Sequence, residues 1–142
     1  MKITYTLFIL LFLSSFSIIP QKQSLSGKWR LICFQDYIKK ENSPKPAESP
    51  EGILTFTFSD DGVNGTLSGR TTTNRVSGNY QLSNDNKINI SSFGGTKINE
   101  MGWGYNIWTT MYQSSSYKFS NDTLTILYDN DSKGMQFILI VD

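Results

Sequence analysis

Residues 69–80 read Gly-Arg-Thr-Thr-Thr-Asn-Arg-Val-Ser-Gly-Asn-Tyr, and they join a polar loop to the start of an alternating strand. From Val76 to Leu82 every second residue falls on one side, which is the period of a half-buried strand. Asn74 is expected to cap the turn with its side chain. Gly78, on the inward face, leaves room for close backbone or ring approach beneath Tyr80 or Trp29.

Two arginines, Arg70 and Arg75, flank the threonines of this loop. We regard them as candidates for a site that binds an anion or a partner. The alternative is that both are simply solvated, because most surface charges need no partner.

Outward from this stretch, the chain is a series of short apolar-alternating segments separated by turn residues. Leu54, Phe56 and Phe58 alternate in one of them, and Asp60-Asp61-Gly62 supplies the turn that follows. Strands are expected near residues 27–34, 53–58, 63–69, 75–82, 88–93, 117–119, 124–128 and 135–141. This spacing predicts an all-β fold, a small antiparallel barrel or sandwich of about eight strands. The prolines of residues 39–50 predict a loop there.

Residues 103–113 break the two-residue period, because their large side chains recur at three and four. This spacing predicts one short helix that closes one mouth of the barrel. Its aromatic residues form either part of the core or a platform for a ligand. The residues concerned are Trp103, Tyr105, Trp108 and Tyr112.

The N-terminus has the pattern of a targeting segment: Lys2, an apolar run, and small residues at Ser15 and Ser17. We predict a signal peptide over residues 1–19, a linker over 20–26 and one domain over 27–142. The protein is then exported, periplasmic or secreted. The alternative is an uncleaved N-terminal anchor, which would be its only connection to a membrane.

Composition excludes several classes of function. A net charge of +1 gives no basic footprint for a nucleic acid. The chain has no histidine, so His-based nucleophiles and metal sites are excluded, and no cofactor or metal is expected. Its single cysteine, Cys33, shares a predicted strand face with Trp29 and Leu31 and is read as a small buried hydrophobe. We expect a protein that is not an enzyme.

The segment Asn74-Arg75-Val76-Ser77-Gly78-Asn79-Tyr80 resembles the Asn-Arg-aromatic-x-Gly-x-Tyr signature of the META domain, the family of heat-shock HslJ-like proteins. Thr96-Lys97-Ile98 is similar to that family's Thr-Arg/Lys-Met element, and residues 117–126 to its closing hairpin. Val76 departs from the aromatic of the signature. Many members also have a cysteine pair, and this chain has Thr73 and Glu100 at those places.

The resemblance implies a cell-envelope or stress-related role without defined chemistry, with Trp29, Asn74, Gly78 and Tyr80 acting structurally. A second resemblance is to lipocalin-like barrels, whose Gly-x-Trp opening is similar to Gly27-Lys28-Trp29. It implies a carrier that binds a small apolar ligand inside the barrel. The arginine that packs over that tryptophan in lipocalins has no counterpart after Arg75. We expect a monomer whose partner is an unknown envelope protein or such a ligand.

Overall fold

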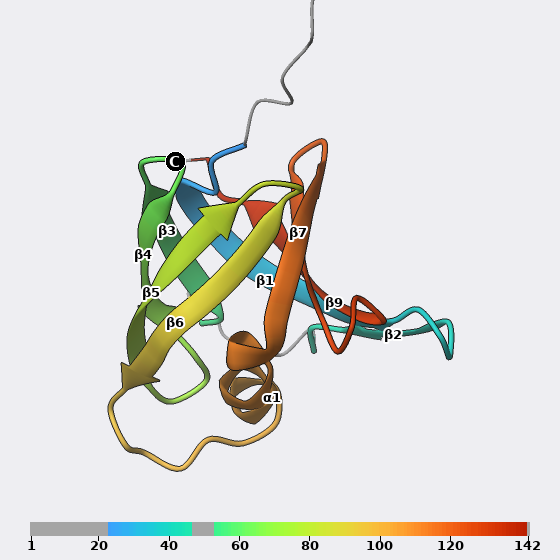
Figure 1. Cartoon of the computed structure of the whole chain (residues 1–142). Helices are drawn as coiled ribbons and strands as arrows, with labels where there is room; N and C mark the ends of the chain where they lie inside the picture. Colours follow the sequence, from blue (N-terminus) through green and yellow to red (C-terminus); the bar gives the residue numbers. More distant parts are fainter. Residues whose placement is uncertain (1–22, 47–52, 142) are drawn as a thin grey trace, which may run out of the picture.

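The computed structural model describes residues 23–46 and 53–141, and the predicted signal peptide lies outside them. The described residues form nine strands, one α-helix and one short 3-10 helix (Figure 1). In chain order they are β1 (Gly27–Asp36), β2 (Glu41–Pro44), β3 (Thr55–Asp60), β4 (Asn64–Arg70), β5 (Arg75–Ser83), β6 (Lys87–Gly95), α1 (Trp103–Thr110), η1 (Met111–Gln113), β7 (Ser114–Ser120), β8 (Thr123–Tyr128) and β9 (Lys133–Leu139).

The strands form one antiparallel barrel. Eight of them follow in the order β1-β3-β4-β5-β6-β7-β8-β9, and pairing of β1 with β9 closes the ring. The prediction of an all-β barrel with one short helix is confirmed. The extra strand is β2, which pairs with the second half of β1 through Cys33↔Pro44. It lies within the segment predicted as a loop, so that prediction was wrong for 41–44.

Alternation in the sequence builds the core. Val76, Tyr80 and Leu82 of β5 are buried, as are Phe56 and Phe58 of β3. Large side chains occupy the barrel interior, which for eight strands is about wide enough for side chains to fill. The largest fully buried ones are Tyr80, Tyr117, Phe56, Phe58, Phe137, Leu25, Leu31, Leu54, Leu67, Ile107, Met111 and Leu124.

A β-bulge moves Cys33 off the predicted face. The register of β1 against β9 shifts between Leu31 and Cys33, so the next buried residue after Leu31 is Phe34. A bulge adds one residue and reverses the faces of those that follow. Cys33 is therefore only half-buried, and burial raises the pKa of its thiol.

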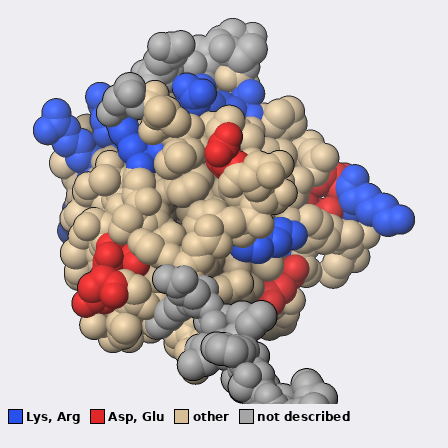
Figure 2. All heavy atoms as spheres, turned by 90° about the horizontal axis from the view of Figure 1, so that it is seen from above, with Lys and Arg blue, Asp and Glu red and all other residues tan. Residues whose placement is uncertain are grey.

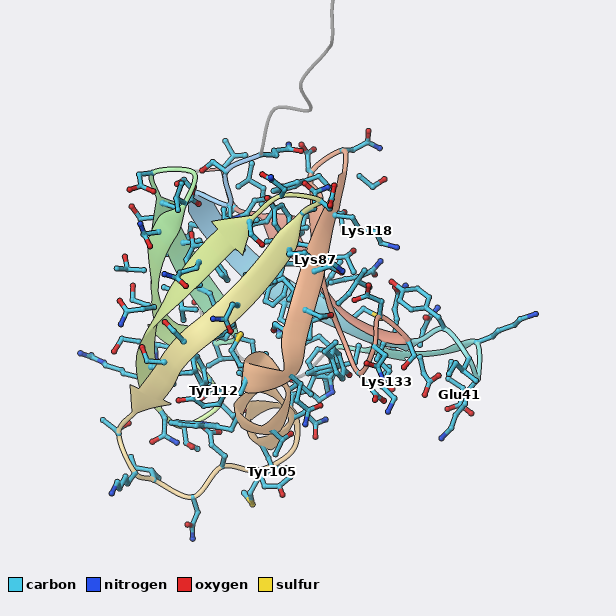
Figure 3. The ribbon with its side chains drawn as sticks, in the orientation of Figure 1. Glu41, Lys87, Tyr105, Tyr112, Lys118 and Lys133 are labelled. Carbon is cyan, nitrogen blue, oxygen red and sulfur yellow. The ribbon has the colours of Figure 1, made fainter. Side chains whose placement is uncertain are left out.

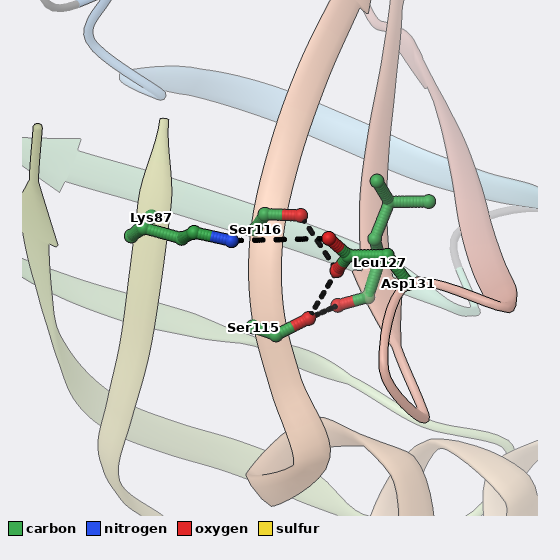
Figure 4. A network of polar contacts seen from close by, with 5 residues as sticks. All are labelled: Lys87, Ser115, Ser116, Leu127 and Asp131. Atoms are coloured by element: carbon green, nitrogen blue, oxygen red, sulfur yellow. Dashed lines mark hydrogen bonds and ion pairs between the residues drawn. The ribbon is translucent and has the colours of Figure 1, made fainter. Parts of the chain in front are cut away.

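The seam between β6 and β7 is the weakest join of the barrel, with Lys87↔Ser116 as its paired position. Asp131, in the turn between β8 and β9, closes this seam with side-chain contacts (Figure 4). Its Oδ1 accepts hydrogen bonds from Ser115 Oγ at 2.5 Å and Ser116 Oγ at 2.8 Å, and Lys87 Nζ lies 3.8 Å from Oδ2. The serine hydrogen bonds hold the pKa of Asp131 below its usual value.

The helix lies across one end of the barrel, opposite the end at which β1 begins (Figure 1). It buries Gly104, Ile107 and, through η1, Met111 against the core. Among the described residues, no helix is long and apolar enough to cross a membrane.

Candidate functional site

At the helix end of the barrel, part of the family signature, Asn74 and Thr96, belongs to one network of hydrogen bonds centred on Glu100. The loop 71–74 between β4 and β5, the loop 96–102 after β6, and α1 meet here. Oε1 of Glu100 accepts hydrogen bonds from the Thr71 hydroxyl, from Asn74 Nδ2 at 2.7 Å and Asn74 N at 3.2 Å, and from Trp108 Nε1 at 3.3 Å. Thr73 N donates to Oε2 at 3.4 Å. One carboxylate thus ties three separate segments together.

Hydrogen bonding decides the charge of Glu100. Burial alone would raise the pKa of this carboxyl, but the hydrogen bonds from Thr71, Asn74 and Trp108 outweigh it and hold the pKa below its usual value. Glu100 is therefore ionised at neutral pH, and its donors favour the charged form.

Asn74 is the second centre of the network. Its Oδ1 accepts from Thr96 Oγ1 at 2.7 Å and from Ile98 N at 2.9 Å, and its Nδ2 also donates to Ile98 O at 2.7 Å. The amide of Asn74 thereby fixes the course of loop 96–102 beside the hairpin. Asn74 was expected to cap its own turn with its side chain. The structure shows instead that its amide joins two loops, while the turn is closed by Thr71 N donating to Asn74 O at 2.9 Å.

Three of the four aromatic side chains of the helix region are fixed by contacts with the barrel. Trp103 packs edge-on against Phe34 at 4.9 Å between ring centroids, and Trp108 against Phe93 at 5.2 Å. Tyr112 Oη accepts from Phe93 N at 2.8 Å and donates to Phe93 O at 2.7 Å, so it caps main-chain groups of β6. The rings do not form one shared platform.

Tyr105 differs from them in position: its side chain lies on the outward side of α1, whereas that of Tyr112, exposed to a similar extent (59% and 55%), lies beside β6 (Figure 3). Tyr105 and Trp108 border a shallow pocket of about 260 Å³ whose other walls include Asn74, Lys97 and Glu100. This pocket is small, and the Asn74 amide and the Glu100 carboxylate in its walls are already hydrogen-bonded within the chain.

Arg70 and Arg75 end up directly opposite one another on the outer face of β4 and β5. Both side chains are exposed and lie outside the Glu100 network, although the main-chain N of Arg75 donates to Thr96 Oγ1 at 3.2 Å. The structure thus brings Asn74 and Trp108 together and separates them from the arginine pair.

Tyr80 and Trp29 lie toward the other end of the barrel. Tyr80 Oη donates to Asp60 Oδ2 at 2.8 Å. The pKa of Tyr80 is raised, mainly by burial and in addition by this hydrogen bond. Trp29 Nε1 donates to Leu25 O at 2.9 Å, and the ring beside Trp29 is Phe119. Leu25 is fully buried although it lies in the predicted linker.

The glycine beneath the Tyr80 ring is Gly65. A Cβ at Gly65 would lie 2.2 Å from the Tyr80 ring, whereas one at Gly78 would meet the Ser92 carbonyl oxygen at the same distance. Of the two approaches expected at Gly78, the one by backbone is confirmed and the one by a ring is wrong: that glycine admits the backbone of β6, close to the shift in the β5–β6 register.

The largest pocket that we describe, about 600 Å³, lies near Asp60, Gly65 and Tyr80. It is open, and most of the residues that line it are polar. The Asp60 carboxylate accepts hydrogen bonds from Tyr80 Oη, Leu25 N and Gly62 N. These hydrogen bonds outweigh the effect of burial and lower the pKa of Asp60. The described residues contain no group of three or more acidic or cysteine side chains placed to hold a metal ion.

Sequence reasoning missed Glu100 as a site residue, although the family resemblance marked its position. The resemblance placed a cysteine pair at Thr73 and Glu100, and the structure brings these two residues into contact. Thr71 carried no separate signal, because its contact with Glu100 depends on the loop geometry.

Comparison with known proteins supports the fold. The chain is similar to the crystal structure of a duf4847 family protein from Bacteroides vulgatus ATCC 8482, with a TM-score of 0.57, 20% identity, and coverage of 80% of this chain and 92% of that one. It is also similar to an NMR structure of a protein from Burkholderia xenovorans, with a TM-score of 0.59, 18% identity, and coverage of 82% and 83%. No match is found among curated proteins.

These solved structures share the fold with this chain at low identity. The family model of the META domain matches residues 23–139, which include every strand described above and the Glu100 network. The chain therefore belongs to the META domain family.

Proposed function

We propose that this META domain is exported and acts in the cell envelope as a non-enzymatic module that binds another protein. One observation carries the non-enzymatic part. The Glu100 carboxylate and the Asn74 amide, at the family signature, form hydrogen bonds with each other and with other groups of this chain. A catalytic acid or base has to reach the proton that it moves.

The proposal of export rests on the N-terminal sequence alone. A basic Lys2, an apolar run and small residues before Pro20 have the order of a signal peptide. Fractionation of cells, followed by mass spectrometry of the mature N-terminus, tests it. We expect the protein outside the cytoplasm with an N-terminus near residue 20. A cytoplasmic protein that still begins at Met1 would contradict export, and a membrane-bound one that begins at Met1 would favour the anchor.

The alternative is a lipocalin-like carrier. A ligand inside the barrel would have to displace side chains such as Phe56, Phe58 and Phe137, which are fully buried there. Titration with a panel of apolar fluorescent ligands, followed by tryptophan emission, compares the two functions. Trp29 reports on the interior because it is buried beside Phe119. We expect no saturable change; a saturable one-to-one change would favour the carrier.

A further inference from the structure

All three arginines of the sequence lie in one row across the barrel wall. Arg30 of β1 pairs with Thr55 of β3, Thr55 with Arg70 of β4, and Arg70 with Arg75 of β5. Directly paired residues of neighbouring strands point to the same face. We call these four residues the arginine row, and the four strands that carry it are neighbours in Figure 1.

The row faces outward. Its neighbours in the strands point inward and are buried: Trp29 and Leu31 beside Arg30, and Val76 beside Arg75. Arg70 and Arg75 are exposed and Arg30 is half-buried. Strand spacing places the side-chain origins of Arg70 and Arg75 about 5 Å apart, and those of Arg30 and Arg70 about 10 Å apart.

Among the residues that the structure describes, no carboxylate is paired with these three charges. Within the described residues, none of the three guanidinium groups has an ion pair or a side-chain hydrogen bond. The next outward row along the same strands is Lys28, Thr57, Ser68 and Ser77, none of which is acidic. By contrast, acidic and basic side chains are interspersed at the end of the barrel opposite the helix (Figure 2).

The arrangement costs stability. Like charges directly opposite on neighbouring strands repel each other, and Arg70 faces Arg75 in this way. Arginine, unlike lysine, presents a planar fork that matches a carboxylate in two hydrogen bonds. A counter-charge that arrives with a partner would turn this repulsion into attraction.

We propose that the arginine row is the docking surface for an acidic segment of a partner protein. This inference rests on the proposed binding function and names the chemistry of its partner. Glutamate or aspartate side chains at alternate positions of an extended segment are spaced at about 7 Å, within reach of arginine side chains 5 to 10 Å apart. The hydroxyls of Thr57, Ser68 and Ser77 line the adjacent surface as hydrogen-bond donors.

The shape of the surface favours a macromolecule over a small ligand. Small-molecule sites are concave and enclose most of the ligand. None of the pockets described above is lined by Arg30, Arg70 or Arg75. A convex barrel wall presents charges that a chain laid across the strands can meet one after another.

The test uses the purified domain and a fluorescein-labelled peptide of alternating Glu and Ser, followed by fluorescence anisotropy at low salt. We expect saturable binding that weakens toward about 0.15 M salt. Single variants Arg70→Gln and Arg75→Gln should weaken it about fivefold each, and the triple variant with Arg30→Gln about 100-fold. Lys39→Gln removes the same charge from the exposed turn after β1 and should leave binding unchanged.

Three results would overturn the proposal: equal binding of a peptide in which Gln replaces Glu, undiminished binding by the triple variant, or binding to anionic phospholipid vesicles without binding to the peptide. Thermal unfolding gives an independent readout, because Arg75→Gln should raise the midpoint in the absence of peptide by removing the repulsion. A midpoint that falls would also count against it. A failure of this binding test can be distinguished from a failure of the proposed export, because these variants leave the N-terminus of the mature protein unchanged.

Discussion

Asn74 and Glu100 are joined twice, because both the main-chain N and the side-chain Nδ2 of Asn74 donate to Oε1 of Glu100, at 3.2 and 2.7 Å. The two residues lie on different loops, and the same Glu100 oxygen also accepts from Trp108 of the helix. This carboxylate therefore holds the helix end of the barrel together. The family resemblance placed a cysteine at Glu100 and another at Thr73. The contact between these two residues indicates that hydrogen bonds here occupy the place of a covalent link.

Replacing Glu100 by glutamine should destabilise the fold. Glutamine keeps the shape of the side chain but loses the charge that strengthens the hydrogen bonds from Asn74 and Thr71. Its NH2 group would also face a group such as Thr73 N, which is itself a donor and cannot donate to it. We expect a loss of about 1–2 kcal/mol in the free energy of unfolding, at the low end for a charged hydrogen bond because Glu100 is half-buried. Urea unfolding measures it. Glu41→Gln, on the exposed strand β2, is the control, and an equal loss in both variants would contradict the role of Glu100.

The Glu100 contribution should depend on pH. The folded pKa lies below the usual value of 4.5, so the charged form stabilises the fold. This stability is fully present above the unfolded pKa and is lost as pH falls through the folded pKa. The difference in unfolding free energy between the wild type and Glu100→Gln should therefore be constant from pH 7 to about pH 5 and shrink below it. A difference that grows in acid would refute this assignment. Asp60 also titrates in acid, but it is present in both proteins and cancels.

Restoring the cysteine pair should form a disulfide. Thr73 Oγ1 donates to Asn99 O at 3.2 Å, and Thr73 N to Glu100 Oε2, so the two positions already lie side by side. In the variant Thr73→Cys/Glu100→Cys, built with Cys33→Ser, the bond would close a loop of about 28 residues, for which chain entropy gives about 3.6 kcal/mol. Thiol titration and urea unfolding with and without reductant measure its formation and effect. If the oxidised form is no more stable than the reduced one, the loops are not placed as described.

Tyr112→Phe should weaken the open edge of β6. The hydroxyl both accepts from Phe93 N and donates to Phe93 O, and its loss leaves these main-chain groups without that partner. We expect about 1–2 kcal/mol of destabilisation and faster amide hydrogen exchange at Phe93. Tyr105→Phe is the matched control, because its ring is exposed on the same helical region. Unchanged exchange at Phe93 would show that the hydroxyl does not protect this edge.

The barrel could be predicted from the sequence because its signal is local. Val76, Tyr80 and Leu82 alternate within one strand, and their burial follows from that period alone. Strand β2 was not predicted because all four of its residues are exposed, so its sequence shows no apolar alternation. Cys33 was misplaced because one bulged residue reverses the faces of β1, and no feature of the local sequence marks that bulge.

The site could be predicted only in part, because it depends on which loops and strands meet. Asn74 and Trp108 were found from the family signature and from the aromatic spacing. Glu100 was not predicted as a site residue, since its hydrogen-bond donors come from segments 8 to 29 residues away. Arg30 was not predicted as part of a site for the same reason. Its alignment with Arg70 depends on the register of both strands against Thr55, which apolar alternation does not specify.

The contact between Gly65 and Tyr80 offers a test of the inward packing at the other end of the barrel. Gly65 pairs directly with Tyr80, and a Cβ there would lie 2.2 Å from the ring. Gly65→Ala should therefore force the ring away from Asp60 and cost about 1–3 kcal/mol, the range for overpacking a filled core. Gly94→Ala is the control, because a Cβ there meets nothing within 4 Å. Urea unfolding compares the two, and the fluorescence or NMR signals of Tyr80 should shift only in the Gly65 variant. If both variants are equally stable, Tyr80 does not depend on Gly65 for its place beside Asp60.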